Sequence, residues 1–138
     1  MNRYFSVLAL LTILPASSIF AQTLSPGDIA IIGVNSDNPD EFGFVALVDI
    51  AAGTEIGFVD HGWQANGTFR TSEDELFYTV PNTLARGTVT VIDDTGGAPR
   101  FSTSGDQLIA FQGTITSPTM IYAVNFSGND WQTDATSS

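Results

Sequence analysis

The sequence predicts an all-β domain, either a sandwich or a barrel, for three reasons. Its apolar residues fall into seven short runs, most of which alternate between two faces as strands do. Turn-forming residues separate these runs at a spacing that is typical of all-β sandwiches and barrels. No segment shows a helical period with capping residues at its ends.

The expected strands can be justified in order. The first is a nearly continuous apolar segment rich in Ile, and the second places Phe42, Phe44, Ala46 and Val48 on one face. Both are apolar enough to predict strands that are covered on both faces, whereas the later runs alternate more clearly. The seven expected strands are residues 28–34, 42–48, 55–60, 76–80, 88–93, 107–112 and 120–126.

The alternation also predicts which side chains face the core. Within residues 88–93 two valines alternate with two threonines, and we expect the valines to point inward. The side chains expected between the two sheets are Ile31, Phe44, Val48 and Val91. Residues that favour turns cluster where strands should end, at residues 35–39, 51–54, 66–68, 81–87, 95–99, 104–106 and 113–118.

The first 21 residues have the layout of a secretory signal peptide. Arg3 provides a positive start, an apolar run follows, and small residues lead to Ala21 before Gln22. The apolar run is shorter than the roughly 20 residues that span a bilayer, so a retained anchor is the weaker interpretation. We therefore expect a signal peptide at residues 1–21, a sandwich domain at 22–126 and a loose tail at 127–138, and a secreted or surface location without membrane insertion after cleavage.

Charge and composition exclude several classes of function. The chain has 4 Lys and Arg residues against 15 Asp and Glu residues, which gives a net charge of −11. Binding a phosphate backbone or an anionic lipid surface requires clustered cations, so neither nucleic acid nor such a membrane is an expected partner. Cysteine is absent, which excludes disulfides and thiolate metal sites. The acidity itself is explained either by cation binding or by solubility in an exported protein.

The acidic residues of one loop suggest a metal site. Asn35, Asp37, Asp40 and Glu41 lie close together on a predicted turn, and calcium prefers several such oxygen ligands. The spacing departs from an EF-hand, and Asn and Asp also bond to their own backbone in turns. Calcium binding and a purely structural turn are therefore both open.

Residues 60–63, with the sequence DHGW, form the most distinctive short string. In one interpretation Asp60 orients His61, the only histidine, for acid-base or metal chemistry. In the other, the string is a turn that aims Trp63 over the edge of the core, and neighbouring side chains at a strand end need not interact. A Gly-x-Ser-x-Gly elbow is absent. We expect no catalytic residues.

Aromatic residues outside the expected strands are candidates for ligand binding. Trp63, Phe69 and Phe101 lie in predicted loops, where exposed rings could stack on sugars or contact a protein partner. Hydrophobic plugs that close the ends of the core are the alternative explanation.

Six short strings occur in an order that carries a resemblance. They are GDIAII at residues 27–32, DEF at 40–42, GW at 62–63, VP at 80–81, LARGT at 84–88 and SGDQLI at 104–109. Together they resemble the lamin-tail type of immunoglobulin-like domain, and more closely the lamin-tail-like modules in secreted and surface proteins of bacteria. The similarity spans residues 24–112, departs from the usual pattern at the turn of residues 49–53, and lacks a further closing strand.

The resemblance implies an Ig-like antiparallel β-sandwich that mediates binding or anchoring and names no ligand. We therefore expect a secreted, non-catalytic binding or structural module whose partner is an extracellular protein or polysaccharide. Bacterial modules of this type often accompany exported nucleases or phosphatases, so an accessory module of a longer hydrolase is one alternative. A calcium-dependent carbohydrate-binding domain is another.

Overall fold

A computed structural model describes residues 21–70, 73–126, 128 and 131. All of the predicted signal peptide except Ala21, and all of the predicted tail except residues 128 and 131, lie outside the described residues. Within them there is no helix of the length and apolarity needed to cross a membrane. The strands are β1 (Ile29–Asn35), β2 (Glu41–Ala46), β3 (Glu55–Val59), β4 (Glu75–Thr79), β5 (Val89–Asp93), β6 (Asp106–Thr114) and β7 (Ser117–Phe126), with a short 3-10 helix η1 (Asp94–Gly96) after β5.

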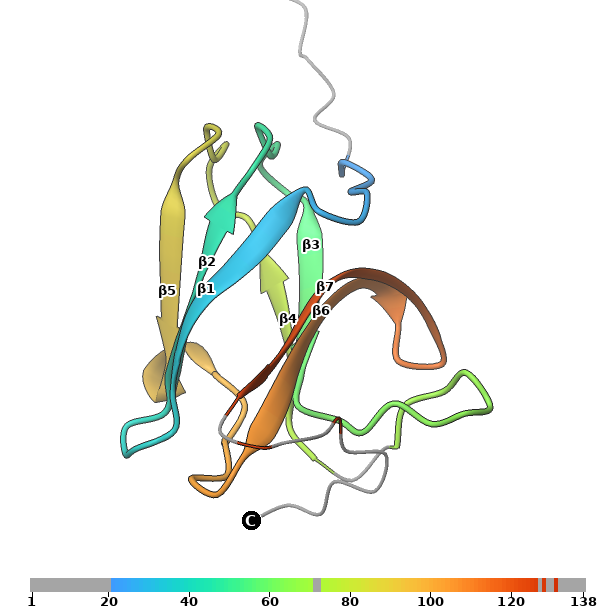
Figure 1. Cartoon of the computed structure of the whole chain (residues 1–138). Coiled ribbons are helices and arrows are strands. Elements are labelled where there is room, and N and C mark those ends of the chain that lie inside the picture. The colour runs from blue at the N-terminus through green and yellow to red at the C-terminus, as the bar shows by residue number, and fades with distance from the viewer. Residues whose placement is uncertain (1–20, 71–72, 127, 129–130, 132–138) are drawn as a thin grey trace, which may run out of the picture.

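The strands form two antiparallel sheets that pack face to face as a sandwich (Figure 1). One sheet has the order β1-β2-β5 and the other has the order β4-β3-β6-β7. The all-β prediction with seven strands is confirmed, and the structure selects the sandwich over the barrel. Each predicted strand overlaps one observed strand, because turn residues interrupt the alternating pattern where the chain reverses.

Aromatic side chains fill the space between the two sheets. Phe42 and Phe44 from one sheet meet Phe58 from the other, with ring centroids 4.7 and 5.3 Å apart. All three side chains are buried, in a core that also holds Ile29, Ile56 and other aliphatic residues. Offset and tilted ring pairs of this kind add to the stabilisation that burial alone provides.

The expectation that the first two strands are covered on both faces is wrong. Ile32 in β1 is 56% exposed, because the second sheet packs on only one side of the β1-β2-β5 sheet. The doubly covered strand is β6. Its Leu108 and Ala110 face the core between the sheets, while Ile109 and Phe111 belong to a second cluster on the outer face.

The prediction of which β5 side chains face the core is also wrong. Val91 is 63% exposed, whereas Ile92 is buried. Thr90 lies opposite the buried Phe44 and therefore shares its inward face. Valine and threonine are both β-branched and fit either face of a strand, so the short run did not define its own orientation. Of the other core predictions, Ile31 and Phe44 are buried and Val48 is half-buried.

A glycine allows the closest approach within the larger sheet. Gly57 in β3 pairs with Phe111 in β6, and a β-carbon on Gly57 would lie 2.4 Å from the Phe111 ring. The ring of Phe111 lies over the glycine and contacts the rings of Phe69 and Phe77. The outer cluster therefore depends on the absence of a side chain at residue 57.

Replacing Phe44 by Ala should lower the free energy of unfolding by about 3–5 kcal/mol, as for other buried aromatic residues. Val91→Ala is the matched control, since its exposed side chain should contribute within about 0.5 kcal/mol. Urea denaturation of both variants measures the difference. Equal losses would contradict the assignment of inward and outward faces.

Replacing Gly57 by Ala should destabilise the fold by about 1–3 kcal/mol, because the Phe111 ring would have to move within a packed cluster. Adding Phe111→Leu should recover part of that loss by making room for the methyl group. A denaturation series of the two single variants and the double variant tests this coupling. Strictly additive losses would show that the two sites do not interact.

Candidate ligand-binding site

The candidate site lies where β3 ends and β6 begins. These strands are antiparallel neighbours and Val59 pairs with Ile109, so the residues after Val59 lie beside the first residues of β6. The chain then makes an excursion over residues 62–70. Backbone hydrogen bonds from Arg70 N to the Gly62 carbonyl (2.8 Å) and from Gln64 N to the Thr68 carbonyl (2.9 Å) close this excursion like a hairpin.

Aromatic packing holds the excursion against the sheet. Trp63 pairs with Phe69 across the hairpin, with their ring centroids 5.0 Å apart in an edge-to-face arrangement. Phe69 in turn contacts Phe111 on the outer face of β6, at 5.5 Å between centroids. The half-buried Trp63 is therefore fixed by a ring that is itself part of the second cluster.

An apolar pocket of about 280 Å³ opens beside Trp63. Its base is the outer face of the β6-β7 hairpin, and Trp131 is the second aromatic residue that lines it. The complete lining is Trp63, Gln107, Ile109, Met120, Ala123 and Trp131. Apolar walls with few polar groups are typical of ligand pockets.

A buried polar network lies next to the pocket. Gln107 donates from Nε2 to the His61 carbonyl at 2.8 Å, and His61 Nε2 donates to the Glu73 carbonyl at 2.8 Å. Because a carbonyl can only accept, His61 carries a proton on Nε2. Asp106 accepts from the backbone N–H groups of Ser102 and Gln107 at 2.9 and 2.8 Å. Gln107 thus connects this network to the pocket that it lines.

Burial and neighbouring carboxylates raise the pKa of three acidic groups at this end of the sandwich. Burial, followed by the charges of Asp106 and Glu73, raises the pKa of Asp60 to about 8. Burial also raises the pKa of Glu73 and of Asp106 above their ordinary values. Asp60 is only 3% exposed and its Oδ1 has no hydrogen-bond partner among the described residues. A neutral, protonated Asp60 is therefore favoured at pH 7.

The structure gives the DHGW string a specific arrangement. His61 is held by the Glu73 backbone carbonyl, and its Nδ1 has no partner among the described residues. The neighbouring Asp60 carboxylate therefore does not orient the imidazole ring. Trp63 packs on Phe69 over the edge of the second cluster, as the turn interpretation expects.

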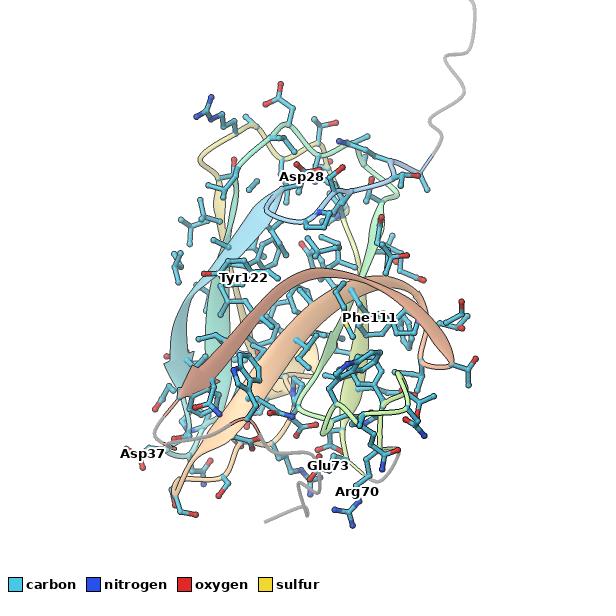
Figure 2. All side chains as sticks on the ribbon, turned by 45° about the vertical axis from the view of Figure 1, so that its right-hand side comes forward. Asp28, Asp37, Arg70, Glu73, Phe111 and Tyr122 are labelled. Atoms are coloured by element: carbon cyan, nitrogen blue, oxygen red, sulfur yellow. The ribbon has the colours of Figure 1, made fainter. Side chains whose placement is uncertain are left out.

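The acidic residues of the β1-β2 loop lie apart from this network. Figure 2 shows Asp37 at the tip of a separate loop, well away from Glu73 and Arg70. Asn35 accepts from Asp37 N and donates to the Pro39 carbonyl, both at 3.1 Å, as in a structural turn. Asp40 accepts from Phe101 N at 3.3 Å.

In the described part of the chain no three His, Asp or Glu side chains are grouped to hold a metal ion. Calcium binding by Asn35, Asp37, Asp40 and Glu41 stays a prediction.

Of the two interpretations of the loop aromatics, burial favours hydrophobic plugs over exposed binding rings for two of the three residues. Phe69 and Phe101 are each only 4% exposed. Phe101 packs against Phe42 and Phe126 at the end of the main core, and Phe69 closes the second cluster. Both rings are hydrophobic plugs: Phe101 closes the end of the main core, and the excursion that carries Phe69 covers the outer face of β6. Trp63, in contrast, lines the pocket described above.

Sequence reasoning missed most of the pocket. Ile109, Met120 and Ala123 lie in β6 and β7, and nothing in the sequence distinguishes them from other apolar strand residues. The sequence held one signal at Gln107, a polar residue directly before the apolar run of residues 108–111, and the structure buries this side chain fully. Buried polar side chains require specific partners.

Comparison with protein families, with curated proteins and with solved structures finds no match to this chain.

Stability should fall as the pH rises from about 4 to about 8. The folded-state pKa of Asp60 is raised to about 8 from 3.8, so the contribution of the protonated form is complete below pH 4 and is lost through pH 8. Asp60→Asn cannot ionise and should flatten this decline, by an amount on the order of a few kcal/mol across the range. Denaturation at pH 5, 6.5 and 8 measures it.

Asp37→Asn is the matched control for this prediction, because Asp37 lies exposed on the β1-β2 loop. It should leave the slope of stability against pH unchanged. An unchanged slope in Asp60→Asn would show that Asp60 is ionised in the folded protein.

Proposed function

We propose that this protein is an exported, non-catalytic binding module that holds an extracellular polysaccharide in the pocket beside Trp63. The observation that carries the proposal is the composition of this pocket. Both tryptophans of the chain line it, together with the apolar surface of Ile109, Met120 and Ala123. The apolar face of a sugar ring packs well against an indole, and the polar edge of an indole tolerates a wet surface.

The aromatic support of Trp63 favours recognition without a large rearrangement. Phe69 fixes the indole edge-to-face, and Phe111 supports Phe69 from the sheet. A pre-positioned ring spares the ligand the cost of ordering that side chain on binding. A pocket volume of about 280 Å³ suits one or two units of a long chain.

Charge narrows the class of polysaccharide. A net charge of −11 repels acidic polymers such as uronic-acid polysaccharides and nucleic acids. The pocket lining contains no charged side chain and one amide, that of Gln107. We therefore expect a neutral polysaccharide.

The burial of Asp60 supports a non-catalytic role. Strongly shifted carboxyl groups often mark active sites, but Asp60 is 3% exposed and cannot contact a substrate in this conformation. The side chains that line the pocket include no carboxylate and no nucleophile. The pocket is therefore suited to holding a ligand and lacks groups that would transform it.

The hydrogen bonds of Gln22, the first residue after the predicted cleavage site, are compatible with export. Gln22 donates from its backbone to Thr54 Oγ1 at 3.1 Å, and its side chain accepts from Ala51 N at 3.0 Å. Its carbonyl also accepts from Gln112 Nε2 at 2.9 Å. Cleavage before Gln22 would preserve all three interactions. The resemblance to lamin-tail-like Ig-like modules, whose role is binding or anchoring, supports the same proposal.

Soluble neutral glucan, xylan and mannan should each be titrated into the protein while tryptophan fluorescence is recorded. Because both tryptophans line the pocket, an occupied pocket must change the emission. Affinity electrophoresis in gels that contain the same polymers provides an independent readout. We expect binding to at least one polymer and its loss in Trp63→Ala.

Two further variants keep this test decisive. Ala123→Arg places a long side chain at an exposed position of the pocket and should also abolish binding without unfolding the protein. Leu47→Ala removes an exposed apolar side chain outside the pocket and should bind like the wild type. Absence of any response to the three polymers, or unchanged binding by Ala123→Arg, would refute the polysaccharide proposal.

A further inference from the structure

The outer face of the β1-β2-β5 sheet is apolar and uncovered. Ile32, Val89 and Val91 are 56%, 52% and 63% exposed, and none of them belongs to either of the two core clusters. Exposed apolar side chains are common singly, whereas a contiguous group on one face often marks an interaction surface. This face lies on the opposite side of the molecule's core from the pocket beside Trp63.

Two glycines create a depression in this face. Gly33 in β1 and Gly43 in β2 lie directly opposite each other in the sheet, so neither strand presents a side chain there. The resulting hollow has a volume of about 330 Å³ and includes Ile32, Val89 and Val91 in its lining. A β-carbon on Gly43 would meet its neighbours at 3.7–3.8 Å, which is ordinary contact. The packing of the sheet therefore does not require glycine at residue 43.

Strand β5 forms an open edge beside the depression. It pairs with β2 on one side and with no described strand on the other, and Figure 1 shows it at the outer margin of the molecule. Natural edge strands are usually protected by lysine, proline, a bulge or a covering loop. The sequence VTVID of β5 has no lysine or proline, and its register with β2 is regular.

Two neighbouring carboxylates lie at one end of the same face. Glu41 and Asp93 are directly opposite in the register of β2 and β5, on the face that also carries Gly43 and Val91. Like charges at such positions repel each other. Hydrogen bonds from Thr95 and from Gly96 N lower the pKa of Asp93, which keeps it ionised. Arg100 forms its ion pair with Asp74 and not with this pair.

We propose that this surface binds an extended peptide segment of another protein, which adds to β5 as a further strand. The segment has apolar residues at alternate positions, which lie beside Val89 and Val91 on the exposed face, and a Lys or Arg that reaches Asp93 and Glu41. In strand addition the backbone hydrogen bonds provide affinity and the alternate side chains provide specificity. This inference concerns a different surface from the polysaccharide pocket and does not depend on it.

Charge complementarity selects this occupant over a second copy of the chain. Pairing two β5 edges would bring together two molecules that each carry a net charge of −11, with a carboxylate pair beside both edges. A basic peptide would instead neutralise those carboxylates. Binding should therefore weaken as sodium chloride is raised from about 0.05 to 0.5 M, since salt screens exposed charges.

The test uses blocked synthetic peptides in which Val occupies two alternate positions, Lys the next alternate position, and Thr the positions between. One peptide has this order and a second has the reverse order, because the direction of the added strand decides where Lys lies. Backbone amide NMR of the full mature chain should show shifts concentrated in residues 88–94 with one of the two peptides. The same peptide with Glu in place of Lys should bind roughly tenfold more weakly or not at all.

Three variants separate the proposed contacts. Val91→Lys places a cation on the exposed face and should abolish binding, whereas Leu47→Lys, at another exposed apolar position, should not. Gly43→Val fills the depression with a residue that strands favour and should weaken binding roughly tenfold while the fold is kept. Circular dichroism and the tryptophan emission of the distant pocket verify folding in each case.

Several results would overturn the inference. These are absence of amide shifts at millimolar concentrations of both peptides, equal binding of the Lys and Glu peptides, or unchanged binding by Val91→Lys. A concentration-dependent dimer in light scattering, lost in Val91→Lys, would show that a second copy occupies this edge instead.

Discussion

The double coverage of strand β6 is the constraint on which the rest of the structure depends. One face of β6 contributes Leu108 and Ala110 to the core between the sheets, and the other carries Ile109 and Phe111. A two-layer sandwich leaves that second face exposed, so the chain must cover it with the excursion of residues 62–70. The pocket beside Trp63 arises where this cover ends, which makes the candidate site a consequence of how the outer cluster is closed.

Charge connects the two proposed surfaces. The chain has few cations to balance its carboxylates, so apolar contacts must provide much of the binding energy while charge selects the partner. At the Trp63 pocket, where the lining is uncharged, this favours neutral polymers. At the β5 edge, where Glu41 and Asp93 face each other, it favours a basic segment. The buried carboxyl groups have a different effect, because the pKa of Asp60 near 8 lowers stability toward alkaline pH.

Much of the site was beyond prediction for a physical reason. Trp63 was a candidate because it lies in a predicted loop, where an exposed ring could bind a ligand. Ile109, Met120 and Ala123 are ordinary strand residues whose outward position depends on which layer covers which face. Glu73 and Asp106 are distant in the sequence from Asp60, and only folding brings their charges close enough to shift its pKa. For Phe69 and Phe101 the sequence indicated loops, while burial depended on the openings that those loops cross.

The sequence by itself determined the all-β class, the number of strands, the position of the turns and the sign of the surface charge. These properties follow from local alternation, from residues that favour tight turns and from composition. The tertiary structure alone decided the orientation of β5, with Val91 outside and Ile92 inside, because Val and Thr fit either face of a strand and only the opposing sheet distinguishes the two. It also decided which strand is covered twice and which edge stays open, since both depend on how two sheets stack rather than on any local pattern.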